Sequence, residues 1–292
     1  MERCVDQGYY SRDSSMSYLV IQGLEVETRD LKAIAKLSGS ARIEGIGNNT
    51  FRLFDYKTQD GVAEYCANAK LDFAFIPRPR KLSDFGLVAM DMDSTLITSE
   101  CIDEIADIRG IKPQVAAITA SAMRGEIEYH QSLHRRLALL EGLDESALLR
   151  VYEERLRLSP GAERLLERLR SLGIKTLLVS SGFTFFTERL KHRLSIDYTL
   201  SNELEFKNGK LTGKLQGRTV DAQIKAAKLR ELRDALRLSR EQIIVIGDGA
   251  NDLAMMAEAG VSIAYHAKPV VREKATYCFD YVGLDGLLNL YA

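Results

Sequence analysis

Two acidic segments carry the residues of this chain that are best suited to chemistry. Asp91 and Asp93 lie in DMDST (91–95), and Asp248 and Asp252 lie in GDGANDLAMM (247–256). Side chains at positions i and i+2 of an extended segment share a face, so Asp91 and Asp93 are expected to point to one spot. Two such charges about 4 Å apart repel by roughly 4 kcal/mol at an effective dielectric constant of ~20. The four carboxylates therefore predict a site that is fully ionised only around a cation.

The ligands that these segments offer are all oxygens, which favours Mg²⁺ and argues against zinc or copper. A calcium-binding loop starting at Asp91 is excluded, because Leu96 and Ile102 occupy the positions at which Gly and Glu are needed. The competing interpretation is structural, with DMDST as an acidic loop at a strand end and GDGAND as a turn and helix cap. For Gly247 and Gly249 we prefer the structural interpretation.

Lys225 and a serine-rich turn add groups that could bind an anion. Lys225 heads an apolar helical stripe formed with Leu229, Leu232 and Leu236, so it is expected to point inward and to hold a phosphate. A lysine that snorkels to the surface is the structural alternative. The turn Ser180-Ser181-Gly182 offers a hydroxyl and successive backbone N–H groups to an anionic oxygen, although alone it would be only a polar turn.

Three apolar runs supply the elements that must position these groups. FGLVAM (85–90), IKTLLV (174–179) and QIIVIG (242–247) alternate with helical segments, which predicts an α/β fold with a doubly wound parallel sheet. Ligands of such sheets lie beyond the carboxyl ends of the strands, so the polar residues that follow the three runs are expected to converge. The long stretch between the first two runs predicts an inserted helical cap at about 100–158. Asn208-Gly209 predicts a short hairpin.

The chain before the first run predicts a smaller domain. Residues 16–77 read as strand, helix, strand, strand, helix, strand, which is typical of an α+β ferredoxin-like arrangement. Residues 78–84 are polar, contain a proline and are expected to form a linker. Residues 1–15 are expected to be a disordered tail, and residues 85–292 to form the larger domain with its cap.

Charge and composition limit the partners of this chain. Its 292 residues include 40 Lys+Arg and 41 Asp+Glu, so no excess of positive charge favours nucleic acid or an anionic membrane surface. No apolar run approaches the roughly 18 residues that a membrane span needs. The first sixteen residues lack an apolar leader and the four cysteines are scattered singly, which together predict a cytoplasmic protein with reduced thiols.

The motifs, taken in this order, resemble those of a known family. DMDSTLITSE, VSSGF, Lys225 and GDGANDLAMM are similar to the motifs of the haloacid-dehalogenase-like (HAD) superfamily and, more closely, of the phosphoserine phosphatases. The resemblance covers roughly residues 85–275. It implies Mg²⁺-dependent hydrolysis of O-phosphoserine to serine and phosphate through an aspartyl-phosphate, the last step of serine biosynthesis. Residues 18–77 resemble amino-acid-binding ACT-like modules.

The resemblance also implies a role for single residues. Asp91 is the expected nucleophile and Asp93 the expected acid and base, and Asp91, Asp248 and the backbone carbonyl of Asp93 are the expected metal ligands. Glu100 would pair with the substrate ammonium and Arg136 with its carboxylate. Their structural alternatives are an acidic residue in a first helical turn and a solvated helix face. The complete set of expected substrate-binding residues is Glu100, Tyr129, Arg136, Ser180, Ser181, Gly182, Lys225 and Asn251.

Two residues depart from the family pattern. Tyr129 stands where the family usually has Phe, so the lid over the substrate would carry a hydroxyl. Ser181 stands where the family has Gly, and its backbone N–H serves only if the turn does not need a positive φ there. Alternative functions are a phosphatase or phosphotransferase for another small phosphomonoester, or an amino-acid-sensing binding protein with an inert core. A homodimer through the N-terminal domain is a further expectation.

Overall fold

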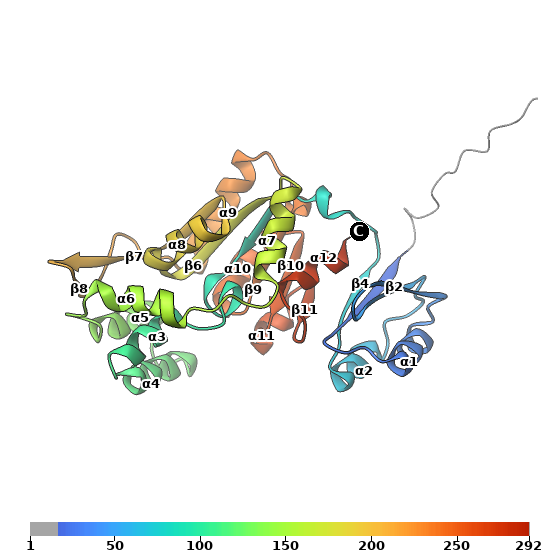
Figure 1. Ribbon diagram of the computed structural model, residues 1–292, viewed down its shortest axis with the longest axis horizontal. Helices are drawn as coiled ribbons and strands as arrows, with labels where there is room; N and C mark the ends of the chain where they lie inside the picture. Colours follow the sequence, from blue (N-terminus) through green and yellow to red (C-terminus); the bar gives the residue numbers. More distant parts are fainter. Residues whose placement is uncertain (1–16, 292) are drawn as a thin grey trace, which may run out of the picture. The chain divides into compact units, whose positions relative to one another are not determined.

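The computed structural model describes residues 17–291, which divide into two compact units. The smaller unit contains the chain up to Leu82 and again from Leu287, and the larger unit runs Ser83–Gly286. The larger unit is therefore inserted into the smaller one along the chain (Figure 1). The tail expected at residues 1–15 lies outside the described residues.

The smaller unit is a four-stranded antiparallel sheet in the order β2-β3-β1-β4 with two helices. Alternate residues of β1, Leu19 and Ile21, point to one face and pack with Ile34 and Cys66 of the helices. This explains why the expected order of elements and the observed one agree. The elements are β1 (Tyr18–Gln22), α1 (Thr28–Ser38), β2 (Arg42–Gly47), β3 (Thr50–Phe54), α2 (Val62–Ala69) and β4 (Asp72–Ile76).

The end of the chain completes the smaller unit. Helix α12 (Leu287–Leu290) is held to β1 because the Tyr18 hydroxyl donates to the Leu290 carbonyl over 2.8 Å. The side-chain amide of Asn289 donates to Oε1 of Gln22 over 2.7 Å, and the guanidinium of Arg52 donates to the backbone carbonyl of Asn289 over 3.2 Å. These bonds place the last described residues with the smaller unit, whereas the sequence-based boundaries assigned all of 85–292 to the larger domain.

The larger unit is built on a seven-stranded sheet in the order β11-β10-β9-β5-β6-β7-β8. All neighbouring strands are parallel except β7 and β8, which form the expected hairpin around Asn208 and Gly209. The prediction of an α/β fold with a parallel sheet is thus confirmed. The strands are β5 (Leu87–Met90), β6 (Lys175–Phe183), β7 (Tyr198–Lys207), β8 (Lys210–Gln216), β9 (Ile243–Gly247), β10 (Val261–Tyr265) and β11 (Tyr277–Phe279).

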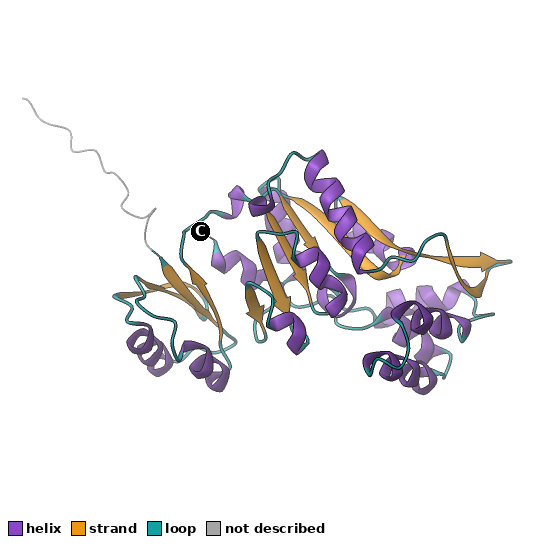
Figure 2. Cartoon of the chain, turned by 180° about the vertical axis from the view of Figure 1, so that it is seen from behind, coloured by secondary structure: helices purple, strands orange, loops and turns teal. Residues whose placement is uncertain are grey.

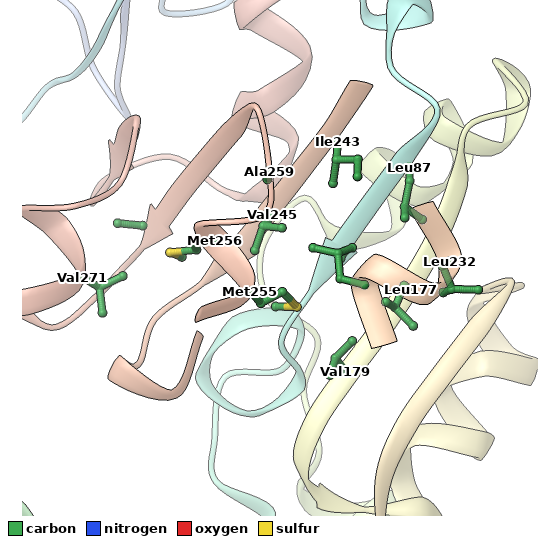
Figure 3. Packing of buried hydrophobic residues seen from close by; sticks show 13 residues of the cluster. Leu87, Leu177, Val179, Leu232, Ile243, Val245, Met255, Met256, Ala259 and Val271 are labelled. Atoms are coloured by element: carbon green, nitrogen blue, oxygen red, sulfur yellow. The ribbon is translucent and has the colours of Figure 1, made fainter. Parts of the chain in front are cut away.

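Helices cover both faces of this sheet (Figures 1 and 2). On one face Leu177 of β6 and Val245 of β9 pack with Leu232 of α9 and Met255 of α10, and Figure 3 shows this cluster. Because both faces are buried, the central strands read as continuous apolar runs. The helices around the sheet are α7 (Ala162–Ser171), α8 (Thr184–Leu194), α9 (Ala222–Ala235), α10 (Leu253–Met256) and α11 (Pro269–Arg272).

A helical insertion follows β5, within the range in which the cap is expected. Its helices are α3 (Cys101–Ile108), α4 (Lys112–Met123), α5 (Tyr129–Ala138) and α6 (Glu145–Arg150). The turn between α5 and α6 is bonded to the β7–β8 hairpin, since the N–H of Gly142 donates to Leu211 and the N–H of Leu211 donates to Leu143, both over 2.8 Å. None of the helices described between residues 17 and 291 has the length and apolar character needed to cross a membrane.

Candidate active site

A pocket of about 620 Å³ lies at the carboxyl ends of the parallel strands of the larger unit. Its floor receives Asp91 from the end of β5, Ser181 and Gly182 from the end of β6, and Asp248 from the end of β9. Its upper wall comes from the helical insertion and includes Tyr129. The convergence that the strand pattern predicts is therefore present.

The D-x-D segment leaves β5 in an irregular turn. The N–H of Asp91 donates to the carbonyl of Ile246 over 3.0 Å, which holds the start of the turn beside β9. Asp91 and Asp93 both keep extended backbone angles, and the intervening Met92 is completely buried. Ser94 then takes a left-handed conformation with φ 58°, which turns the chain away from the sheet. Both carboxylates consequently line the pocket.

Lys225 lies under Asp91 and is buried, as the apolar stripe on α9 predicts. Its ammonium donates to Oδ1 of Asp91 over 2.5 Å and to Oδ1 of Asp252 over 2.9 Å. Burial alone would lower the pKa of Lys225, but the carboxylates of Asp252 and Asp91 outweigh burial and raise it. The lysine therefore remains positively charged. Burial also raises the pKa of Asp91, and the charge of Lys225 partly offsets that rise.

Asp93 has hydrogen-bond donors on both carboxylate oxygens. The N–H of Cys101 donates to Oδ1 over 2.8 Å, and the hydroxyl of Ser180 donates to Oδ2 over 3.2 Å. Burial, together with the charge of Glu100, nevertheless raises the pKa of Asp93 to about 7. A carboxyl group with a pKa near neutrality can both give and take a proton, which suits a general acid and base.

Three carboxylates form a cluster that could hold a metal ion. One oxygen each of Asp91, Asp248 and Asp252 lies within 4.8 Å of the others, and all three residues are buried. Burial and the neighbouring Asp252 raise the pKa of Asp248 to about 6, so the cluster resists full ionisation without a cation. Oxygen donors in this number suit a hard divalent ion.

The observed cluster differs in composition from the expected metal set of Asp91, Asp93 and Asp248. It contains Asp252, while the carboxylate of Asp93 is engaged by Cys101 and Ser180. The expectation for Asp93 concerns its backbone carbonyl, which these bonds leave available. Asp252 uses its second oxygen to accept a hydrogen bond from the N–H of Gly249 over 3.1 Å.

Gly182 is the residue that brings β6 close to Asp93. A Cβ atom at Gly182 would lie 2.5 Å from Oδ2 of Asp93 and 2.9 Å from Oγ of Ser180, which is too close for either. Ser181 has no positive φ, so a side chain is tolerated there and its backbone N–H keeps an ordinary geometry. The strand itself continues to Phe183 with a shift of register after Val179, further than the apolar run predicts.

The residues expected to read the substrate all reach the pocket or lie directly beneath it. Glu100, Tyr129, Arg136 and Asn251 line its wall. Glu100 is exposed and accepts a hydrogen bond from the Ser94 hydroxyl over 3.0 Å. Ser180 and Lys225 are completely buried, and they donate hydrogen bonds to Asp93 and Asp91, respectively.

The sequence interpretation missed several pocket residues. Asp103 lines the pocket, as Arg136 does; burial raises the pKa of Asp103, and the charge of Arg136 acts against that rise. Lys268 follows β10, and its N–H donates to the carbonyl of Asp248 over 3.0 Å. The apolar run VSIAY (261–265) is a fourth strand end and would have pointed to Lys268. Asp252 belonged to the predicted acidic cluster but received no role.

Comparison with known proteins gives matching families for both units. A family model described as haloacid dehalogenase-like hydrolase matches residues 88–257, and one described as a domain of unknown function matches residues 19–60. The phosphoserine phosphatase of Polaromonas sp. is 54% identical over 72% of this chain and 91% of the relative. That of Haemophilus influenzae is 46% identical over 76% of this chain and 69% of the relative.

Solved structures extend the likeness to 94% of this chain. A probable phosphoserine phosphatase from Vibrio cholerae is similar with a TM-score of 0.82 and 37% identity, over 94% of this chain and 85% of its own. A HAD family hydrolase from Salmonella enterica serovar Typhi is similar with a TM-score of 0.86 and 34% identity, over 94% of this chain and 98% of its own. A substrate-bound phosphoserine phosphatase complex is similar with a TM-score of 0.67 and 34% identity, over 71% of this chain and 99% of its own.

Proposed function

This chain belongs to the haloacid dehalogenase-like hydrolases and, within them, to the phosphoserine phosphatases, and on this premise we propose that it hydrolyses O-phosphoserine to serine and inorganic phosphate. The observation that carries the proposal is the floor of the pocket. A buried carboxylate, Asp91, is paired with a buried ammonium, and a second carboxyl group with a pKa of about 7, that of Asp93, lies beside it. Asp91 is therefore suited to act as the nucleophile, and Asp93 as the general acid and base.

The reaction proceeds in two displacements. In the first, an oxygen of Asp91 bonds to phosphorus and the bond from phosphorus to the serine oxygen breaks, while Asp93 gives its proton to the departing alkoxide. In the second, Asp93 takes a proton from water as the water oxygen attacks the aspartyl-phosphate, which releases inorganic phosphate and restores Asp91. Lys225, Ser180 and the backbone N–H groups of the turn at Ser181 and Gly182 bind the phosphoryl oxygens.

We assign the divalent cation as Mg²⁺. The oxygens of Asp91 and Asp248 and the backbone carbonyl of Asp93 would hold it, with Asp252 close to the same point. The all-oxygen donor set and the raised pKa of Asp248 fit a hard cation. When bound, Mg²⁺ reduces the repulsion between the carboxylate nucleophile and the phosphate dianion.

The wall of the pocket selects the amino acid. Glu100 would pair with the ammonium of the substrate, and the planar guanidinium of Arg136 would bind its carboxylate through two parallel hydrogen bonds. Tyr129 and Asn251 would close the site around the substrate. The reaction would then be the last step of serine biosynthesis, which would place the protein in the cytoplasm.

We further propose that the smaller unit is a ferredoxin-like, ACT-like module that supports a homodimer. Its strand order β2-β3-β1-β4 and the alternation of its helices and strands support the first part. The second part is supported by β2, an edge strand whose residues are nearly all exposed. Sedimentation of the full chain tests the homodimer, and a monomer at micromolar concentration would exclude it.

The function itself is tested by phosphate release from O-phosphoserine with the full chain. We expect turnover with Mg²⁺, almost none with excess EDTA, and recovery when Mg²⁺ is restored. An analogue that lacks the amino group should be a poor substrate, because Glu100 then has no partner. Preference for that analogue would point to another small phosphomonoester, and tight serine binding without any turnover would point to an amino-acid sensor.

A further inference from the structure

The end of β6 beside the pocket is an irregular segment of the sheet. Strand β6 pairs with β7 through Val179 and Leu200, and then again through Phe183 and Asn202. Residues 180–182 of β6 therefore lie opposite a single residue of β7, and the regular ladder is interrupted there. Such an interruption leaves backbone groups without their usual partners and redirects the side chains that it contains.

The side chain of Asn202 supplies a hydrogen bond within this interruption. Asn202 is only 1% exposed, and its Nδ2 donates to the backbone carbonyl of Ser181 over 2.7 Å. Its Oδ1 accepts a hydrogen bond from the N–H of Val220, also over 2.7 Å. A backbone N–H requires an oxygen and a carbonyl requires an N–H, so these two partners allow the amide only one orientation.

The bond from Asn202 also sets the direction of the next backbone N–H. The peptide between Ser181 and Gly182 is trans, so its C=O and its N–H point in opposite directions. With the C=O held by Asn202, the N–H of Gly182 donates to Oγ of Ser180 over 2.7 Å. The Ser180 hydroxyl in turn donates to Oδ2 of Asp93 over 3.2 Å. A continuous series of hydrogen bonds therefore joins Asn202 to Asp93.

We propose that Asn202 is a positioning residue, which holds the Ser181–Gly182 peptide and thereby fixes the Ser180 hydroxyl where Asp93 and the phosphoryl group of the substrate meet. Asn202 is not among the described residues that line the pocket, so it acts through Ser180. A hydroxyl that accepts one hydrogen bond becomes a better donor of the next, which favours the bond to Asp93. The inference rests on the function proposed above, because it takes Asp93 as the general acid and base.

A purely structural role for Asn202 is the competing interpretation. Its amide would then only satisfy two buried backbone groups, the carbonyl of Ser181 and the N–H of Val220. Both interpretations predict a lower melting temperature when Asn202 is replaced, because those groups lose their partner. Only the positioning role predicts that the loss of catalytic rate depends on the Ser180 hydroxyl.

A double-mutant cycle on the full chain tests the proposal. The variants are Asn202→Ala, Ser180→Ala and their combination, and the readout is kcat/KM for phosphoserine with Mg²⁺, measured well below every melting temperature. We expect Ser180→Ala to lower kcat/KM roughly 100-fold and Asn202→Ala roughly tenfold. In the Ser180→Ala background, Asn202→Ala should lower it by less than about twofold, because the positioning residue then has no hydroxyl to position.

The matched control is Gln22→Ala, which removes another buried amide, one that accepts a hydrogen bond from Asn289 in the smaller unit. It should lower the melting temperature and leave kcat/KM unchanged. If Asn202→Ala does not fold, Asn202→Asp at pH 8 replaces it in the cycle, because the carboxylate keeps the acceptor for Val220 but cannot donate to Ser181. Unchanged kcat/KM in the Asn202 variant, or an equal loss with and without the Ser180 hydroxyl, would overturn the proposal.

Failure of this inference and failure of the proposed function are distinguishable. Wild-type protein that releases no phosphate from phosphoserine contradicts the function, whatever the variants do. In that case the same cycle is measured as the affinity for inorganic phosphate, by isothermal titration with Mg²⁺ present. A loss of affinity in Asn202→Ala that disappears in the Ser180→Ala background would support the positioning role, and equal losses or none would reject it.

Discussion

The ammonium of Lys225 lies 2.5 Å from Oδ1 of Asp91, and neither side chain is more than 6% exposed. Replacement by Met would leave Asp91 and Asp252 buried without their cation, which should destabilise the fold by about 3–5 kcal/mol and abolish turnover. Urea unfolding and phosphate release measure the two effects. Lys228→Met is the matched control, since Lys228 lies on the same helix and pairs with the exposed Glu231.

The double variant Lys225→Met/Asp252→Asn separates the two roles of the lysine. Removing the Asp252 charge should restore part of the lost stability, because one unpaired buried carboxylate disappears. Turnover should stay abolished, since the phosphoryl group still lacks its cation. Recovery of activity in the double variant would show that Lys225 only neutralises Asp252.

Asp91→Asn should lower turnover of phosphoserine by at least roughly 10³-fold, because an amide oxygen does not attack phosphorus to give the aspartyl-phosphate. The fold should persist, since Lys225 keeps Asp252 as a partner. A phosphate-release assay and a thermal melt are sufficient. Asp234→Asn, at an exposed position, serves as the control. Turnover within tenfold of the wild type would assign the nucleophile to another residue.

The stability of metal-free protein should fall as pH rises. Burial raises the pKa of Asp93 to about 7 and that of Asp248 to about 6, both above the ordinary value of 3.8. Groups with raised pKa values stabilise the fold fully below their unfolded pKa and lose this contribution as pH rises through 6 to 7. In EDTA the free energy of unfolding should therefore drop between pH 5 and pH 8, by on the order of 3 kcal/mol.

Mg²⁺ should reverse this loss. Its ligands bind it deprotonated, so the melting temperature should rise more on addition of Mg²⁺ at pH 8 than at pH 5. Asp248→Asn, which removes one titrating ligand, should flatten the pH dependence and weaken the response to Mg²⁺. Equal responses at both pH values would contradict the acidic cluster as the metal site.

Substrate analogues should distinguish the role of Arg136 from that of Glu100. Arg136→Ala should raise KM for phosphoserine roughly 10- to 100-fold and leave KM for phosphoethanolamine, which lacks the carboxylate, nearly unchanged. Glu100→Gln should raise KM for phosphoserine and spare the analogue without the amino group. Arg135→Ala, at the exposed neighbouring position on α5, is the control. Parallel losses on all substrates would mean that these residues support the cap rather than read the amino acid.

Gly182→Ala should reduce turnover strongly, because the added methyl group would meet Oδ2 of Asp93 at 2.5 Å and displace the acid and base. Gly45→Ala is a matched control, since its added Cβ would have Phe51 at 3.5 Å as its nearest neighbour, an ordinary contact. The measurement is kcat with phosphoserine. Unchanged kcat in Gly182→Ala would mean that Asp93 is not held by the close approach of β6.

Most of the site could be predicted because it lies where apolar runs end. Asp91 and Asp248 follow buried strands, and Lys225 heads an apolar stripe, so strand ends and helical spacing identify them. Lys268 was not predicted as a pocket residue, because the strand before it was not recognised. Asp103 was not predicted either, because a carboxylate near the start of a helix is common. Only the tertiary structure places it in the pocket with Arg136.

Hydrophobic periodicity predicted the fold of the larger unit, but it did not predict that this unit ends at Gly286. Helix α12 is a short apolar segment whose partners, Tyr18 and Gln22, are far away in the sequence. Nothing local distinguishes such a segment from the end of the preceding domain. Periodicity describes faces of elements, and it does not say which distant face an element will cover.

The insertion of the larger unit between β4 and α12 sets an order on biosynthesis. A ribosome releases residues 17–82 first, yet the segment that bonds to Tyr18, Gln22 and Arg52 is synthesised only after the whole of the larger unit. The phosphatase domain can therefore mature while its host is still missing a piece, the reverse of the usual N-terminal-first sequence. A released chain that ended at Gly286 would contain the complete larger unit and a smaller unit without the hydrogen bonds of α12.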